Sequence, residues 1–307
     1  MPAYLLGRLG SALLVVLGAA TIVFLAMRAI PGDPAVVMLG VSATPEQVAA
    51  LRMRWGLDAP LPVQYVNFLA RMAVLDFGQS IRLGMPAAEA VAQTLPYTVY
   101  LALAAFVMAL LAGFPLGIYS ALRRGKAADR TVSLLSLAGQ SLPSFWVGIM
   151  LVLLLSRTLH LLPSGGAGTP EAVLLPAVTL ALPLLSVIVR LVRSGLLEAM
   201  GEPYIQTARA KGLNERRVIG VHGVRNMLIP VVTVVGLELG TLLGGAVIVE
   251  TVFAWPGLGR LLIDSIAARD YAVVQASVVM LVVFFVAINI VVDLLYGVLD
   301  PRVRVDG

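Results

Sequence analysis

Six long apolar stretches, separated by polar and basic segments, constrain this chain more than any other feature. They cover residues 9–30, 97–122, 131–156, 172–189, 229–249 and 271–292. About 20 apolar residues cross the hydrocarbon core of a bilayer as a helix, and in lipid a helix pairs its own backbone groups. Charged residues make up only 13% of the chain, whereas soluble domains carry about a quarter. The sequence therefore predicts an all-α integral membrane protein with six transmembrane helices.

The distribution of positive charge predicts how these helices are oriented. If both termini are cytoplasmic, the inner segments carry 14 Arg and Lys residues and the outer segments carry 7, with Arg28 at a boundary. This is the bias that the positive-inside rule describes. The first apolar run continues past Ala19 and Ala20, so it is interpreted as a span and not as a cleaved signal peptide.

Composition and missing motifs exclude several classes of protein. The sequence has no cysteine, so it offers no disulfides or thiolate metal ligands, and we expect neither a metal nor a bound cofactor. The excess of Arg and Lys lies in loops between spans, which indicates membrane topology and no nucleic-acid partner. No GxxxxGK[ST] loop is present to bind ATP. An intramembrane hydrolase is not favoured either, because His222 lies in a basic loop and not in a span.

By membrane side, the sequence divides into three parts. Residues 1–30 hold the N-terminus and the first span, 31–96 form an external segment with short helices, and 97–307 form a core of five spans. In the external segment, Thr44 is a suitable cap for a helix over 45–55. The core includes a long cytoplasmic segment, 194–228.

That cytoplasmic segment contains a basic, helix-prone stretch from Tyr204 to Pro230. Good helix formers precede Gly212, which can adopt the left-handed conformation that ends many helices. Asn214 can cap a second helix from Glu215. The stretch therefore predicts two short helices joined at a glycine, although its positive charge alone would also fit simple anchoring in the cytoplasm.

Two membrane segments contain unusual residues. Gly236, Gly240 and Gly244 recur every fourth residue and predict a smooth helix interface. Glu238 lies well inside the same span, where it could line a water-filled cavity, bind a cation or hydrogen-bond to a neighbouring helix, and we expect the last. The motif GQSLPSFW at 139–146 contains Pro143, which frees a backbone carbonyl and predicts either a simple kink or a role in a translocation path.

The order of residues in the basic stretch resembles the cytoplasmic coupling loop of ABC importer permeases. Its long spacing between Gly212 and Pro230 is similar to that of the dipeptide, oligopeptide and nickel permease family. Gln206 replaces the first acidic residue of the general pattern, which weakens the case for a specific salt bridge there. Further motifs occur in the family's order at 30–34, 56–65, 76–80, 161–166 and 249–262, so the resemblance covers essentially the whole chain.

This resemblance implies a type I ABC importer permease fold in the bacterial cytoplasmic (inner) membrane, and import of small solutes by alternating access. The implied partners are a second homologous permease, two ATP-binding cassette subunits or one fused ATPase, and an extracytoplasmic solute-binding protein. ATP and Mg would bind in the ATPase partners, so the chain itself is not an enzyme. The solute stays open among dipeptides, oligopeptides, nickel complexes, glutathione, opines and heme.

The resemblance also assigns roles to residues. The residues implied to couple to the ATPase are Tyr204, Ile205, Thr207, Ala208, Arg209, Ala210, Lys211, Gly212, Leu213, Arg216 and Arg217. Among these, Ile205, Ala208 and Leu213 are expected to supply the buried contact and the arginines its charged rim. Candidates for the translocation path are Gln140, Ser141, Pro143 and Glu238. The alternative is a proton-coupled secondary transporter that uses Glu238, although no internal repeat supports it.

Overall fold

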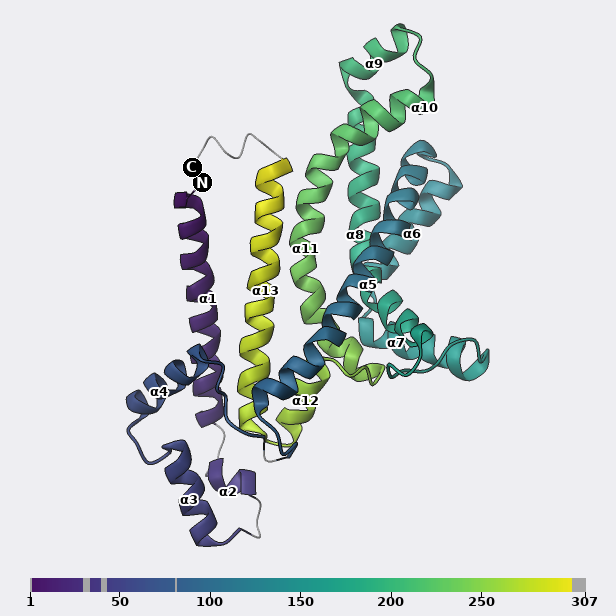
Figure 1. Cartoon of the computed structure of the whole chain (residues 1–307). Helices are drawn as coiled ribbons and strands as arrows, with labels where there is room; N and C mark the ends of the chain where they lie inside the picture. The colour runs from purple at the N-terminus through teal and green to yellow at the C-terminus, as the bar shows by residue number, and fades with distance from the viewer. Residues whose placement is uncertain (1, 30–33, 40–42, 81, 300–307) are drawn as a thin grey trace. The chain divides into compact units, whose positions relative to one another are not determined.

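The computed structural model describes residues 2–29, 34–39, 43–80 and 82–299, and these residues are predominantly helical. Among them the only β-type pairing is an isolated bridge between Gln79 and Pro86. The helices of the first part of the chain are α1 (Pro2–Ala29), α2 (Pro34–Leu39), α3 (Pro45–Trp55), α4 (Leu61–Ala73), α5 (Ala87–Leu122), α6 (Ala127–Ser141) and α7 (Ser144–Leu151). Those of the second part are α8 (Leu174–Gly201), α9 (Pro203–Ala210), α10 (Glu215–Arg217), α11 (Val224–Val252), α12 (Leu258–Ala267) and α13 (Tyr271–Leu299) (Figure 1).

Five of the six predicted membrane spans are confirmed as single long helices, whereas the third is broken. Five helices among the described residues are long and apolar enough to cross a membrane alone, and α6 with α7 and the π-helical turn after it (Val152–Thr158) makes a sixth if this bent pair counts as one span. The two halves of this span are bent by 108°. Pro143 has no N–H to continue α6 and forces the preceding Leu142 into an extended conformation (φ −79°, ψ 133°). The apolar stretch predicted as one span over 131–156 is thus divided at Pro143, the residue at which the sequence predicted a kink or a role in a translocation path.

The long helix α5 is unbroken across Gly113, Pro115 and Gly117. The two glycines are points of close contact with α8. A Cβ atom on Gly113 would lie 2.8 Å from the side chain of Ile188, and one on Gly117 would lie 2.7 Å from that of Val192. The small residues of this span therefore serve packing between two helices.

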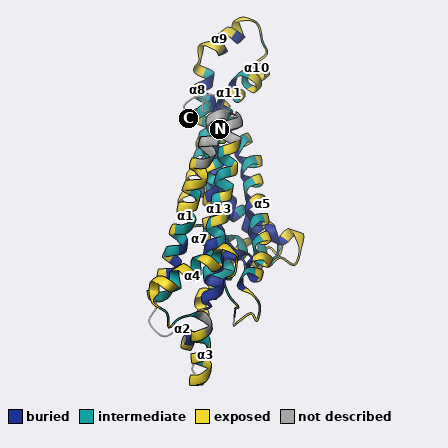
Figure 2. Cartoon of the chain, turned by 60° about the vertical axis from the view of Figure 1, so that its left-hand side comes forward, coloured by how far each residue is buried: buried dark blue, intermediate teal, exposed yellow. Residues whose placement is uncertain are grey.

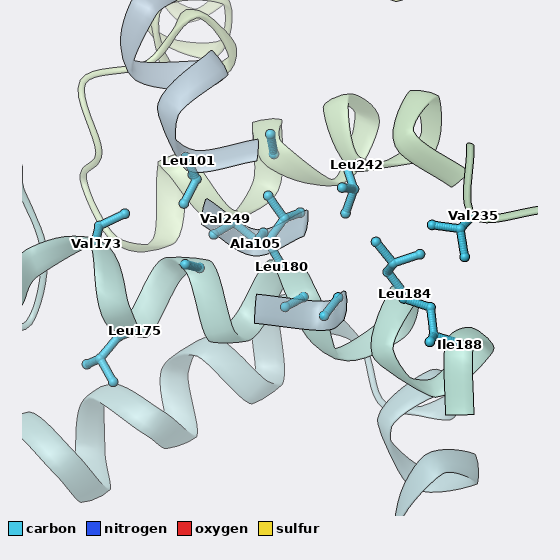
Figure 3. Close-up of a cluster of buried hydrophobic side chains, with 14 of the residues drawn as sticks. Leu101, Ala105, Val173, Leu175, Leu180, Leu184, Ile188, Val235, Leu242 and Val249 are labelled. Atoms are coloured by element: carbon cyan, nitrogen blue, oxygen red, sulfur yellow. The ribbon is translucent and has the colours of Figure 1, made fainter. Parts of the chain in front are cut away.

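The C-terminal part of the fold is a compact unit made of residues 99–255 and 288–307. Its helix α8 is the most buried of the single-helix spans, because α5 and α11 supply apolar side chains around it. Leu180, Leu184 and Ile188 of α8 pack in the same core as Leu101 of α5 and Leu242 of α11 (Figure 3). This core fixes the positions of α8 and α11, which carry the cytoplasmic segment between them.

A second compact unit comprises residues 1–98 and 256–287. Val23 of α1, Val91 of α5, Leu258 of α12 and Val273 of α13 share one buried apolar cluster. In this unit α12 and the first half of α13 pack against the beginning of the chain. Such long-range packing leaves no local trace in the sequence.

The helix predicted at 45–55 is confirmed as α3, with Thr44 as its cap. The Thr44 hydroxyl accepts a hydrogen bond from the Gln47 N–H at 3.3 Å, and the Gln47 side chain accepts one from the Thr44 N–H at 3.0 Å. After α4, Arg71 donates a hydrogen bond to Asp76 at 3.0 Å and thereby lowers the pKa of that carboxyl group. Most of the motif at 30–34 and the predicted tail at 300–307 lie outside the described residues.

Candidate coupling segment and intramembrane cavity

The cytoplasmic stretch folds into two short helices joined at a glycine, which we call the coupling segment (residues 203–223). Helix α9 begins at Pro203, and beyond its end Gly212 has a φ of +76°, the left-handed conformation that the sequence predicted. The Asn214 side chain accepts a hydrogen bond from the Arg216 N–H at 3.0 Å and so caps α10, as expected. Figure 1 shows α9 and α10 beyond the ends of α8 and α11.

The coupling segment has a small apolar core of its own. Ile205, Ala208 and Val218 are buried together, and Met200 and Leu213 pack against them. Ile205 is 0% exposed, so it is not available to a partner. The expectation that Ile205 and Ala208 contact an ATPase directly is therefore wrong, because their side chains hold α9 against the turn that follows α10.

The opposite side of the coupling segment is open to solvent, and α9 is drawn mostly as exposed in Figure 2. Its exposed residues include Tyr204, Thr207, Arg209, Ala210, Lys211, Gly212, Arg216 and Arg217. Tyr204, Thr207 and Lys211 follow one another at intervals of three and four residues and so share one helix face. Arg209 is paired with Glu215 at 2.7 Å, and this hydrogen bond raises the pKa of the arginine.

Two short helices would suggest a segment that is separate from the fifth span. The second helix of the coupling segment is instead continuous with that span. A π-helical turn over Val218–Gly223 connects α10 to α11 without a break. This turn also packs on α8, where a Cβ atom on Gly223 would come within 3.0 Å of the Leu196 side chain. A displacement of the coupling segment must therefore act on both α8 and α11.

A buried ion pair lies near the same end of this unit. Arg193 of α8 donates two hydrogen bonds to Asp129 of α6, from Nε to Oδ1 at 2.7 Å and from Nη2 to Oδ2 at 3.0 Å. The Asp129 carboxylate also accepts hydrogen bonds from the Ser120 hydroxyl at 2.6 Å and the Gly125 N–H at 2.9 Å. These contacts tie the end of α5, the α5–α6 turn and α6 to α8.

A cavity of about 150 Å³ lies between α8, α11 and the break in the third span. Its polar lining side chains are Gln140, Ser144, Thr179, Glu238 and Thr241. Gln140 and Glu238 were both predicted for a translocation path, and the fold brings them to this one cavity. Ser141 and Pro143, predicted with them, are not among its lining residues.

The hydrogen bonding of Glu238 also differs from our expectation of a bond to a neighbouring helix. Its carboxylate accepts a hydrogen bond from the hydroxyl of Thr241, one turn further along α11, at 2.8 Å. The carboxylate thus faces the cavity and is held by its own helix.

Comparison with known families settles what kind of protein has this fold. The family described as the binding-protein-dependent transport system inner membrane component matches residues 113–305. The N-terminal family of the same transport system membrane components matches residues 1–102. The chain belongs to this family of inner-membrane permeases.

Relatives of this permease match it over nearly its full length. A protein of Brucella abortus named as a peptide transport system permease is 43% identical over 314 residues, covering 100% of both chains. The dipeptide transport system permease DppB of Escherichia coli K12 is 39% identical, and the glutathione transport system permease GsiC of Salmonella choleraesuis is 40% identical, each covering 98% of both chains.

The fold of this permease is also similar to that of a solved transporter. An inward-facing structure of the methionine ABC transporter MetNI covers 69% of this chain and 96% of the matched chain, with a TM-score of 0.58 and 20% identity. A second crystal form gives a TM-score of 0.55. The permease therefore has the type I ABC importer permease fold and is a multi-pass protein of the bacterial inner membrane.

The permease uses the predicted glycine face of α11 only in part. A Cβ atom on Gly236 would lie 2.5 Å from the Val292 side chain of α13, so this glycine permits a close helix contact. Gly240 is buried, whereas Gly244 is exposed and a Cβ atom there would meet nothing within 4 Å. Within this chain the face is therefore an interface at Gly236 but not at Gly244.

Sequence reasoning missed the ion pair between Asp129 and Arg193. A signal for it exists, because Asp129 is the one acidic residue in the inner turn that also holds Arg123, Arg124 and Lys126. An acidic residue that interrupts a positive inner loop needs a partner if it becomes buried. The topology predicted from charge places the start of α6 and the end of α8 on the same side of the membrane, where these residues meet.

Proposed function

We propose that this permease is one half of a heterodimeric pore that imports peptides or related small solutes at the expense of ATP. The proposal assigns it a second homologous permease, two ATPase subunits or one fused ATPase, and an external solute-binding protein as partners. ATP and Mg bind in the ATPase partners. The names of its relatives support the solute class and the partners, and the geometry of the coupling segment carries the mechanism.

In this proposal the ATPase receives the exposed face of α9. Tyr204, Thr207 and Lys211 form the contact, and the exposed Arg216 and Arg217 lie at its rim. The buried cluster around Ile205 keeps α9 in one position relative to α8 and α11. The coupling segment then moves as a body when the ATPase subunits close on ATP.

The two spans attached to the coupling segment transmit this motion to the pore. Helix α8 enters it at Gly201, and α10 continues into α11 through the π-helical turn. ATP binding opens the pore outward by favouring one of two conformations, which requires that the ATPase bind the two arrangements of coupling segments with different affinities. The Asp129–Arg193 pair couples the motion of α8 to α5 and α6.

The test uses the backbone conformation of Gly212. There is open space around its Cβ position, so a substitution there acts through the backbone. Valine in the left-handed region costs roughly 1–2 kcal/mol, whereas asparagine tolerates that region. We expect Gly212→Val to lose most of the ATPase stimulation by solute-loaded binding protein in the reconstituted importer, and the matched Gly212→Asn variant to keep it.

Two measurements accompany this comparison. Co-purification of all subunits shows that both variants assemble, and the basal ATPase rate shows that the ATPase partner is intact. Equal stimulation in the two variants would refute a coupling role for this turn. Solute movement through the permease without any ATPase partner would instead favour the proton-coupled alternative that uses Glu238.

A further inference from the structure

The cavity beside Glu238 combines one carboxylate with neutral polar groups inside the membrane. Its apolar lining residues include Leu180, Leu184 and Leu242, which are each less than 5% exposed and belong to the hydrophobic cluster drawn in Figure 3. None of the described residues that line it is Lys, Arg or His. A carboxylate in a span is costly unless something compensates its charge, and this cavity offers space for a positively charged group.

One lining side chain holds the carboxylate, and the others add polar groups around it. The Thr241 hydroxyl donates to the Glu238 carboxylate and leaves other acceptor positions on its oxygens open. Thr179 of α8, another lining residue, uses its hydroxyl to bond the Leu175 carbonyl at 2.8 Å. Gln140 and Ser144, on the two sides of the break in the third span, supply a further amide and a hydroxyl.

Pro183 of α8 adds a backbone acceptor to the same region. It lines the cavity together with Thr179, the residue four positions earlier whose carbonyl a helical N–H would normally bond. Proline has no N–H, so the Thr179 carbonyl lacks this intrahelical partner. The Thr179 carbonyl thus joins the Glu238 carboxylate and the Gln140 amide oxygen as an acceptor, and such a set suits a group that carries several N–H bonds and a positive charge.

We propose that this cavity binds the protonated amino group of the transported solute, with Glu238 as its counter-ion. A primary ammonium group has three N–H donors, which can bond the Glu238 carboxylate and the Gln140 amide oxygen. This inference rests on the proposed import function and adds a solute-binding subsite inside the membrane.

The size of the cavity limits how much of the solute it can hold. Its volume of about 150 Å³ is smaller than the roughly 300–1,000 Å³ of pockets that enclose a drug-sized molecule. It accommodates an amino group and the carbons next to it, but not a whole peptide. The remainder of the solute would then lie against the partner permease.

The first experiment separates the solute step from ATPase coupling in the complete reconstituted importer. Glu238→Gln keeps the size and hydrogen-bonding capacity of the side chain but removes its charge. We expect dipeptide transport to fall at least about tenfold, while ATPase stimulation by loaded binding protein stays near the wild-type level. Glu198→Gln, which removes an exposed carboxylate on α8 that does not line this cavity, is the matched control and should transport normally.

The outcomes distinguish this inference from the proposed function. Normal transport by Glu238→Gln would overturn the subsite alone, because the wild-type importer would still be driven by ATP. A parallel loss of transport and of ATPase stimulation would also overturn it, since it would mark a general structural defect. A wild-type complex that shows no ATP-driven transport would instead overturn the proposed function.

A second experiment tests the chemistry of the ligand with small probes. Saturation-transfer NMR on the purified importer without binding protein would compare glycinamide, which has a protonated amine, with N-acetylglycinamide, which has none. We expect a glycinamide signal that is lost in Glu238→Gln, and no such difference for the acetylated probe. Equal glycinamide signals in wild type and variant, or an equal Glu238-dependent signal from the acetylated probe, would refute an ammonium subsite.

Discussion

Replacing Asp129 with alanine is predicted to cost about 3 kcal/mol of unfolding free energy. The carboxylate is only 5% exposed and accepts hydrogen bonds from Arg193, Ser120 and Gly125. Breaking a buried ion pair from one side typically costs about 3–5 kcal/mol, because a charge is left without compensation. The Arg193 side chain is 30% exposed and can regain some water, so we expect the lower end of that range.

A graded series of variants separates the charge from the hydrogen bonds. Asp129→Asn keeps one oxygen acceptor for Ser120 or Arg193 and should cost about 1–2 kcal/mol. The unfolding free energy would be measured by denaturant titration of the purified permease in mixed micelles, followed by circular dichroism. Arg193→Met, which keeps much of the apolar stem, completes a double-mutant cycle with Asp129→Ala.

The cycle gives a clear criterion for the pair. If Asp129 and Arg193 stabilise the fold through each other, the double variant should be more stable than the sum of single costs implies, by about 1–3 kcal/mol. If the costs of the two single variants sum to the cost of the double variant within about 0.5 kcal/mol, the reasoning is refuted. A cost below about 1 kcal/mol for Asp129→Ala would refute it as well, because an exposed pair would give that value.

Three further predictions follow from the packing of individual side chains. Gly117→Leu should destabilise the permease by roughly 1–3 kcal/mol through overpacking of α5 on α8, whereas Gly10→Leu, with nothing near its Cβ position, should leave the thermal midpoint unchanged. Thr44→Ala should cost about 1 kcal/mol, confined to α3, and faster amide exchange in that helix alone would demonstrate it. Thr207→Arg should weaken ATPase binding in a pull-down without loss of stability, whereas Ile205→Ala should lower the thermal midpoint, because its side chain is buried in the coupling segment. Identical effects of these two substitutions would contradict the assignment of exposed and buried faces on α9.

Features that depend on a few neighbouring residues could be predicted from the sequence. Gly212 adopts a left-handed conformation, and Asn214 and Thr44 cap the helices that follow them, because each relies on local backbone chemistry. The six apolar spans were predictable for a similar reason, since crossing a bilayer sets their length and composition.

Features that depend on distant residues could not be predicted in the same way. Asp129 meets Arg193 only because α6 and α8 pack side by side. Gly113 and Gly117 could be read as helix breakers or as contact points, and only the position of α8 decides between these readings. For Ile205 and Ala208, the spacing identified an apolar face but not whether that face belongs to an internal core or to an interface.

The break at Leu142 and Pro143 has a consequence for how the permease is made and kept in the cell. The end of α6 leaves carbonyl groups without intrahelical partners at the depth of the bilayer, and lipid tails cannot satisfy them. These groups must face either water or polar groups of protein, in this chain or in a partner subunit. A copy inserted without its partner subunits is therefore expected to be a target for membrane quality-control proteases, and its lifetime should depend on balanced synthesis of those subunits.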